Sequence, residues 1–205
     1  MEGNLREAAM PYTPETTGVP WPWNVSDGSW TWELFSALPD DGNRYEVIGG
    51  KLTVSPPPKV KHQEISTNLG WQLTTWAKHS GAGKVFTAPV AVVLSTTGSY
   101  LVPDLIFIAK DRLSIIATAN VLGAPDLVVE ILSPSSPRAD WVDKKAAYLA
   151  AGVPHYWVID PQGQTLTAFR LMEGEYRLEG RFEGNASFKP EGFLGLTVDL
   201  AGVWA

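Results

Sequence analysis

The chain has 205 residues, no cysteine and a formal net charge of −6. This length suits one domain with a sizeable core. The lack of cysteine excludes a disulfide scaffold and any thiolate site for zinc or an iron–sulfur cluster. Acidic residues outnumber basic ones by 22 to 16, which weighs against a protein that holds nucleic acid through broad positive charge. An enzyme whose carboxylates bind cations remains compatible with this charge.

The N-terminal part carries no sign of a membrane or export segment. No apolar run reaches the roughly 18 residues of a membrane-spanning helix, and the chain does not begin with the basic and apolar stretches of a secretory signal. We therefore expect no membrane association and a cytoplasmic location. Residues 1–28 contain several prolines and no periodic apolar face, so we expect an extended arm followed by a single domain over residues 29–205.

The first expected elements are a helix, a hairpin and a second helix. The segment "SWTWELFSALPDDGN" (29–43) predicts a short helix with Ser29 as its N-cap and Pro39 as its stop. Alternation around "GG" in "RYEVIGGKLTV" predicts a β-hairpin with a tight primed turn. From His62 to about Lys78, apolar residues recur at helical spacing, which predicts an amphipathic helix closed by "SGAG".

The rest of the chain combines apolar strands with one further long helix. Residues 110–124 predict a short helix or loop, and a helix capped by Ser136, with Pro137 at its first position, should end at Gly152. This order predicts an α/β or α+β fold, with a mixed β-sheet flanked by helices, a leading hairpin and a C-terminal β-meander. The expected strands are 84–94, 100–109, 126–133 and 155–160, followed by "TLTAFRLM" and "YRLEGRFEG".

Glu130 lies in the middle of the apolar strand "DLVVEILS". Burying an unpaired carboxylate costs several kcal/mol, so such a group finds a partner or changes its protonation state. The partner could be a cation on a neighbouring element, a hydrogen-bond network or a metal ion. Because side chains alternate along a strand, the face that carries Glu130 should border a cleft.

Asp104 and Lys144 are the candidate companions of Glu130. Asp104 opens the apolar strand "DLIFI" and, taken alone, also suits a solvated strand end. Asp140, Lys144 and Tyr148 form one stripe on the helix that follows the Glu130 strand, so Lys144 can reach back across the sheet. The alternative is an exposed Asp–Lys pair worth about 0.3–0.5 kcal/mol. Lys145 lies 100° around the helix and should be solvated.

Two carboxylates on adjacent strands beside a lysine form a set suited to phosphodiester hydrolysis. Hard oxygen ligands favour Mg²⁺ or Mn²⁺. Such an ion lowers the pKa of a bound water and offsets phosphoryl charge, while an ammonium stabilises the transition state. A neighbouring residue, His62, starts the first long helix and could bind metal or phosphate, although a surface position is an equally simple reading.

The motifs "VPD" (102–104) and "VEIL" (129–132) resemble the PD-(D/E)XK nuclease signature. The block "PDLVVEILSPSS…D…K…Y…GV…YWVIDP" is similar to a widespread bacterial restriction-endonuclease family of that superfamily, and "RYEVIGGKL" and "SPPPKVKHQEI" match its upstream segments. The resemblance covers residues 30–200. It implies a restriction-endonuclease-like core and a divalent metal, with Asp104 and Glu130 as ligands.

The resemblance also implies a role for Glu46 and a displaced lysine. Glu46 is similar to a carboxylate that the family carries before its first core helix, where it would complete the metal shell; an exposed hairpin residue beside Arg44 is the alternative. The superfamily lysine would fall at position 132, where this chain has leucine. The resemblance therefore places the cation on the next helix, at Lys144. For Tyr148 and Trp157 we expect packing roles rather than chemistry.

Three functions fit these residues. The first is a metal-dependent DNA endonuclease in which Asp104, Glu130 and Lys144 organise a water nucleophile, acting as a homodimer to cut both strands. The second is a nuclease-fold protein without activity that serves as a binding or assembly module, which the nine tryptophans would suit. The third is a buried ion-pair network that only holds the fold together.

Overall fold

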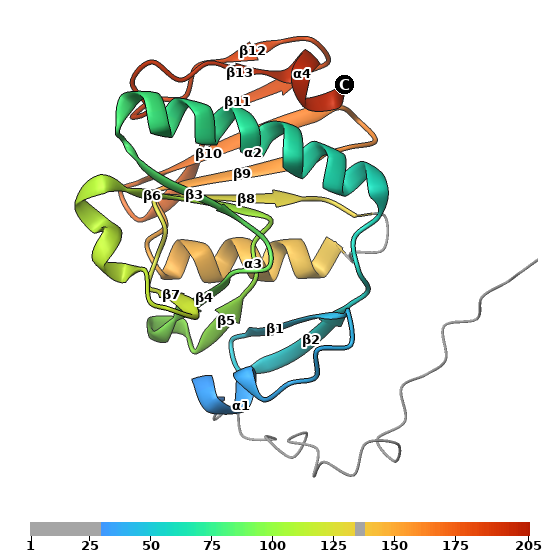
Figure 1. The fold of residues 1–205 in the computed structure, drawn as a ribbon, viewed down its shortest axis with the longest axis vertical. Helices are drawn as coiled ribbons and strands as arrows, with labels where there is room; N and C mark the ends of the chain where they lie inside the picture. Colours follow the sequence, from blue (N-terminus) through green and yellow to red (C-terminus); the bar gives the residue numbers. More distant parts are fainter. Residues whose placement is uncertain (1–29, 134–137) are drawn as a thin grey trace, which may run out of the picture.

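The computed structural model describes residues 30–133 and 138–205, and it describes their side chains except those of residues 138–141. Its centre is a six-stranded sheet in the order β11-β10-β9-β8-β6-β3 (Figure 1). In this sheet β8 and β9 are parallel, and the other described neighbours are antiparallel. The expected mixed sheet is therefore confirmed. Its strands are β3 (Gly83–Thr87), β6 (Leu105–Ala109), β8 (Leu127–Ile131), β9 (His155–Asp160), β10 (Thr165–Met172) and β11 (Glu175–Glu183).

A second sheet of five strands, in the order β2-β1-β5-β4-β7, forms another layer of the molecule. The chain crosses between the two sheets from β3 to β4 and again from β5 to β6. The expected continuous strands over 84–94 and 100–109 are therefore wrong, because each is divided near a proline, Pro89 or Pro103, which cannot donate to a strand ladder. The strands are β1 (Arg44–Ile48), β2 (Lys51–Ser55), β4 (Ala91–Leu94), β5 (Ser99–Leu101) and β7 (Asn120–Leu122).

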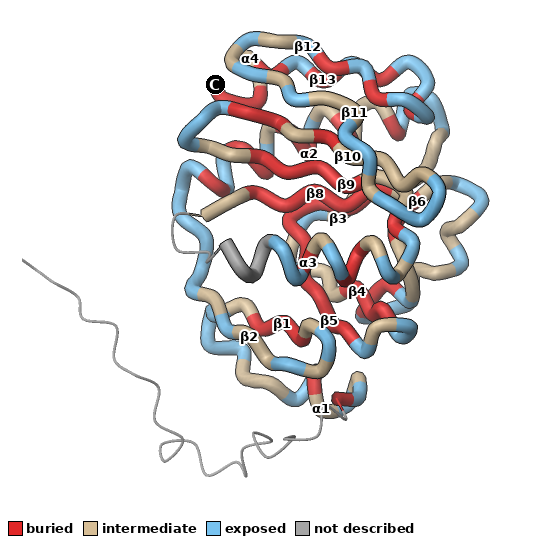
Figure 2. Tube along the Cα trace, turned by 180° about the vertical axis from the view of Figure 1, so that it is seen from behind, coloured by how far each residue is buried: buried red, intermediate tan, exposed pale blue. Residues whose placement is uncertain are grey.

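Two helices cover opposite faces of the six-stranded sheet (Figure 1). The apolar stripe of α2 (Val60–Ser80) packs on one face, where Val129 and Ile131 of β8 join the same core. The helix α3 (Arg138–Ala150) lies between the other face and the five-stranded sheet, and Val128 belongs to this second core. Figure 2 shows β8 and β9 buried along most of their length. The residues of β8 thus alternate between two cores, and Glu130 falls on the α3 side.

The expected local elements are mostly confirmed. The hairpin β1–β2 turns at Gly49 and Gly50, whose φ angles of 54° and 82° are those a primed turn requires. The helix α2 begins two residues before His62 and ends at Gly81, with φ of 66°. The C-terminal meander β9–β10–β11 is antiparallel as expected. Residues 110–124 form a short 3-10 helix, Lys110–Ile115, and β7.

The structure describes the N-cap of α1 but not that of α3. The helix α1 (Trp32–Ser36) is shorter than expected, and its N-cap is Thr31, whose hydroxyl accepts from the Leu34 amide at 3.4 Å. Ser29 lies outside the described residues, as do the expected arm over 1–28 and the cap of α3 at Ser136 and Pro137. The expected end of α3 is confirmed, because Gly152 has a φ of 78° just after the helix.

The C-terminal segment packs over α2. It consists of β12 (Ser187–Phe188), β13 (Val198–Asp199) and α4 (Leu200–Trp204), and their side chains extend the core between α2 and the six-stranded sheet. Within residues 30–133 and 138–205, no helix has the length and apolar character needed to cross a membrane.

Candidate functional site

The predicted site residues converge at one place between the two sheets. Glu46 comes from β1, Asp104 immediately precedes β6, Glu130 lies in β8 and Lys144 in α3. Their exposed fractions are 2%, 1%, 6% and 8%. The readings of Asp104 as a solvated strand end, of Glu46 as an exposed hairpin residue and of Lys144 as part of an exposed pair are therefore wrong. We call Glu46, Asp104, Glu130 and Lys144, together with Arg44, the carboxylate cluster.

Lys144 is positioned by the crossover that joins the parallel strands β8 and β9. The intervening helix α3 packs on the face of β8 to which Glu130 points, so residues on its inner stripe approach that carboxylate. The Lys144 ammonium lies 3.1 Å from Glu130 Oε2 and 2.8 Å from Glu46 Oε2. The predicted contact between Lys144 and Glu130 is confirmed, and the same ammonium also joins β1 to β8.

Two neighbours on α3 differ from their predicted behaviour. Tyr148 is buried, as a packing residue would be, but its hydroxyl also donates to Glu130 Oε1 at 2.7 Å. Lys145 is half-buried rather than solvated, and its ammonium lies 3.5 Å from the ring centroid of Phe169. Lys145 therefore points away from the carboxylate cluster. The side chain of Asp140 lies outside the described residues.

Asp104 is held from several directions. Arg44 Nη1 donates to Oδ1 at 2.7 Å, and the Ile131 amide donates to Oδ2 at 2.7 Å. His62 Nε2 lies 3.2 Å from Oδ2. His62 is 6% exposed, so its reading as a surface residue is wrong. Asp104 consequently ties β1, α2 and β8 together at the corner where the chain passes from one sheet to the other.

Arg44 was not predicted as part of the site, although a signal was available. Arg44 and Glu46 stand two positions apart in β1 and therefore share one face of the strand. Glu46 Oε1 accepts from the Val102 amide at 2.9 Å, so that face points to the corner that contains Asp104. Once Glu46 is placed in the site, alternation places Arg44 there too.

The charges of the carboxylate cluster set its pKa values. Burial raises the pKa of Glu130 to about 7; Lys144 opposes this shift, and Asp104 and Glu46 add to it. Burial also acts to raise the pKa of Asp104, but the hydrogen bond with His62 and the charge of Arg44 outweigh it, so this pKa falls below its ordinary value. Lys144 stays charged because the attraction of Glu130 and Glu46 exceeds the effect of burial and raises its pKa.

Three carboxylates thus face two permanently charged cations, Arg44 and Lys144. One negative charge is left over among these five groups whenever all three carboxylates are ionised. This excess adds to burial, the main cause, in raising the pKa of Glu130 to about 7. A divalent cation would relieve the same excess.

The carboxylate cluster fits a hard divalent ion by donor type and charge, but it is not preformed. Among the residues described, no three histidine, aspartate or glutamate side chains already form a group that could hold a metal. Arg44, Lys144, Tyr148 and backbone amides occupy the carboxylate oxygens. A cavity of about 30 Å³, lined in part by Glu46, Glu130 and Lys144, has room for a water-sized particle. An ion at Asp104 and Glu130 would displace some of these donors.

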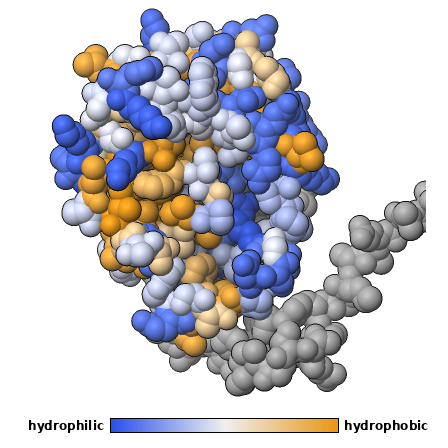
Figure 3. Space-filling model, in the orientation of Figure 1, coloured by the Kyte–Doolittle hydropathy of each residue, from blue (hydrophilic) through white to orange (hydrophobic). Residues whose placement is uncertain are grey.

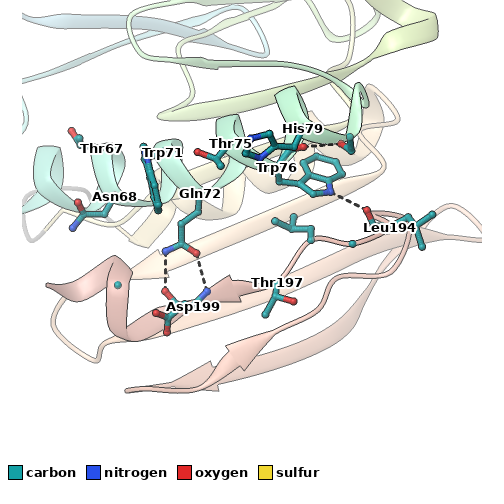
Figure 4. Close-up of a pocket in the computed structure, with 14 residues that line it drawn as sticks. Thr67, Asn68, Trp71, Gln72, Thr75, Trp76, His79, Leu194, Thr197 and Asp199 are labelled. Atoms are coloured by element: carbon teal, nitrogen blue, oxygen red, sulfur yellow. Dashed lines mark hydrogen bonds between the residues drawn. The ribbon is translucent and has the colours of Figure 1, made fainter.

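A wider groove of about 810 Å³ lies away from the carboxylate cluster. It runs between the outer side of α2 and the C-terminal segment, and none of the predicted site residues lines it (Figure 4). Gln72 bonds to the backbone of Asp199 with both amide atoms, and Trp76 donates to the Leu194 carbonyl. These bonds fasten the C-terminal segment to α2.

Comparison with known proteins assigns the chain to a family. The family model Uma2, described as putative restriction endonuclease, matches residues 32–201, which include the whole carboxylate cluster. The chain belongs to the Uma2 family. A crystal structure of a putative nuclease of DUF820 from Anabaena variabilis matches this Uma2 chain with a TM-score of 0.70 and 23% identity, over 85% of this chain and 97% of the other. No protein with a curated function matches significantly.

The Uma2 fold is restriction-endonuclease-like, as the sequence predicted. Position 132 is nevertheless leucine. Leu132 is half-buried and lines the 30 Å³ cavity, so it offers no cation to the carboxylates. The ammonium that approaches Glu130 belongs to Lys144, where the resemblance places it.

Replacing Lys144 by methionine should destabilise this Uma2 protein by about 3–5 kcal/mol at pH 8, because two buried carboxylates lose their shared cation. Lys145→Met is the matched control on the same helix and should cost at most about 1 kcal/mol, since Lys145 is half-buried and does not contact the buried carboxylates. Urea unfolding monitored by circular dichroism measures both. Equal stability of the two variants would contradict the assigned geometry.

Glu130→Gln should change how stability depends on pH. The pKa of Glu130 is about 7 in the folded protein and 4.5 ordinarily. Between these values the folded protein binds more protons than the unfolded chain, so Glu130 makes stability fall as the pH rises. Glutamine does not titrate. From pH 5 to pH 8, wild type should therefore lose up to about 3 kcal/mol more than Glu130→Gln.

Urea unfolding in a metal chelator at both pH values tests this expectation. His155, whose pKa burial lowers to about 4, titrates in both proteins and cancels in the comparison. The exposed Glu175 supplies the control, and Glu175→Gln should follow wild type. Parallel pH profiles for wild type and Glu130→Gln would show that Glu130 is ionised in the folded protein throughout this range.

Proposed function

We propose that this Uma2 protein is a metal-dependent endonuclease that hydrolyses phosphodiester bonds in DNA. The observation that carries the proposal is the buried contact of Lys144 with both Glu130 and Glu46, next to Asp104. Burial of four charged groups is costly for stability alone, and the same arrangement brings hard oxygen ligands and an ammonium together. Membership of a family described as restriction endonucleases supports the same class of reaction.

Asp104 and Glu130 would hold Mg²⁺ or Mn²⁺, with Glu46 as a third ligand. When bound, the ion polarises a phosphoryl oxygen and lowers the pKa of a water molecule. His62 and Arg44 hold the pKa of Asp104 below its ordinary value, so this carboxylate is ready to bind a cation at neutral pH. Tyr148 fixes the orientation of Glu130 through its hydroxyl.

Lys144, Glu130 and His62 would supply charge and orientation at the reacting phosphate. The Lys144 ammonium stabilises negative charge that develops on the phosphate as water attacks. Glu130, as a ligand of the ion, would be held ionised by the charge of the metal and would help to orient the attacking water. His62, beside Asp104, completes the set as an accessory residue.

A purely structural network is the second candidate. Every carboxylate of the carboxylate cluster already has hydrogen-bond donors from neighbouring elements, which a stabilising network requires. In that case the chain would be an inactive binding or assembly module. Metal-dependent cleavage separates the two readings, since a structural network predicts none.

We also propose that the protein acts in the cytoplasm. It would act as a homodimer, because two symmetric sites cut both strands of a duplex. Figure 3 shows apolar side chains gathered on the side of the molecule where the 3-10 helix Lys110–Ile115 and β7 lie. Leu122 is 54% exposed there, beside the half-buried Ile115 and Ile116. This surface supports pairing of two copies.

Supercoiled plasmid and single-stranded circular DNA are the substrates for the test. Wild type should nick or linearise DNA with Mg²⁺ or Mn²⁺ and not with a chelator. Glu130→Gln and Lys144→Met, each confirmed as folded by circular dichroism, should lower the rate at least about a hundredfold, while Lys145→Met should keep it. Inactivity of wild type in both metals, or full activity of Lys144→Met, would contradict the proposal.

A further inference from the structure

A second cavity lies beside the carboxylate cluster. It has a volume of about 400 Å³, and residues at the N-terminal end of α2 and just after β8 line it. His62, which contacts Asp104, lines it, and Leu132 lines both this cavity and the smaller one at Glu130. Any group bound in it would therefore sit next to the proposed reaction site. The lining residues are Lys59, Lys61, His62, Leu132, Ser133, Asp160, Pro161 and Gln162.

The start of α2 is built to attract an anion. Lys59 is the N-cap, and no side chain caps the helix. The first helical bond runs from the Gln63 amide to the Lys59 carbonyl, so the amides of residues 60–62 have no acceptor within the helix. The helix is 21 residues long and its first turn contains no acidic residue, so no side chain of this turn offsets its positive end.

His62 provides an independent sign of a missing ligand. Its side chain is 6% exposed, and both ring nitrogens are buried without a hydrogen-bond partner among the residues that the structure describes. Nε2 faces Asp104 Oδ2 at 3.2 Å, whereas Nδ1 has no such neighbour among these residues. Buried ring nitrogens normally have a partner. Since His62 lines the cavity, an oxygen of a bound anion would supply that partner while Nε2 stays next to Asp104.

The charges around the cavity favour an anion as well. Lys59 is exposed, whereas Lys61 is engaged with the Trp204 carbonyl at 2.6 Å and with Glu64 at 2.9 Å. Asp160 is the opposing carboxylate, and its Oδ1 accepts from the amides of Gln162 and Gly163. Lys59 and the helix end thus supply free donors, and Lys61 adds a positive field.

We propose that this cavity binds a phosphate of the nucleic-acid strand adjacent to the phosphate that the carboxylate cluster acts on. The inference rests on the proposed nuclease function and adds the contact that would position the strand. A phosphate of the strand and free inorganic phosphate present the same oxygens to the protein, so free phosphate should occupy the same cavity. Lys59, His62 and the first amides of α2 bind the phosphate oxygens, and Leu132 separates this cavity from the carboxylates of Glu46 and Glu130.

The first arm of the test uses inorganic phosphate and the full chain. Imidazole resonances from His62, His79 and His155 are followed by nitrogen–proton NMR during titration. Phosphate should shift His62 with a saturating dependence, and Lys59→Ala should weaken the apparent affinity. Lys78→Ala is the matched control, because Lys78 is exposed on the last turn of the same helix and lines none of the cavity.

The second arm uses a short labelled DNA duplex with Ca²⁺ in place of Mg²⁺ to prevent cleavage. Lys59→Ala should lower the slope of log affinity against log salt by about one, and Lys78→Ala should leave it unchanged. Equal slopes for the two variants, or no response of His62 to phosphate, would overturn the proposal. If His62 responds to inorganic phosphate but Lys59→Ala leaves the salt slope unchanged, the cavity binds free phosphate and the assignment to a phosphate of the strand is overturned.

The two proposals can fail separately. Phosphate binding at His62 by a protein that never cleaves DNA would leave the phosphate site and remove the nuclease function. Metal-dependent cleavage that is unchanged in Lys59→Ala, together with no response of His62 to phosphate, would leave the nuclease function and remove the phosphate site.

Discussion

The buried ammonium of Lys144 is the interaction on which the structure depends. It lies between Glu46 of the five-stranded sheet and Glu130 of the six-stranded sheet, and it comes from the helix packed between them. Such a group is tolerated only where both carboxylates are in place, because an unpaired buried charge costs several kcal/mol. The two sheets and α3 are therefore held in one relative arrangement. The apolar cores on either side of β8 bring these elements together, and the charges specify how they meet.

Asp104 fixes the corner that makes this arrangement possible. The chain leaves the five-stranded sheet at β5 and enters the other at β6, and the break leaves Asp104 where Arg44, His62 and the Ile131 amide converge. Asp104, on which this corner is built, is also a proposed ligand of the metal ion. Stability and chemistry thus draw on the same side chains, and binding an ion must rearrange contacts that now stabilise the fold.

Local sequence patterns were sufficient to predict the hairpin, the two long helices and the Glu130 strand, and together with the family resemblance they predicted the approach of Lys144. These features depend on periodicity, on glycine positions and on the way a helix packs back over its own strand. The division of the strands at Pro89 and Pro103 was missed, because apolar alternation is the same in either sheet. Arg44 was missed because its contact with Asp104 joins residues 60 positions apart in the chain. Tyr148 was assigned to packing because its place on the stripe of α3 does not reveal that its hydroxyl donates to Glu130.

The central claim is that the carboxylate cluster binds a divalent metal ion. Calorimetric titration of chelator-treated protein with Mn²⁺ tests it most directly, with wild type compared with Glu130→Gln and with the exposed control Glu175→Gln. The account predicts one site in wild type and in the control, with affinity at least about tenfold weaker in Glu130→Gln. Absence of binding in wild type, both with and without inorganic phosphate, or equal binding in all three proteins, would contradict it.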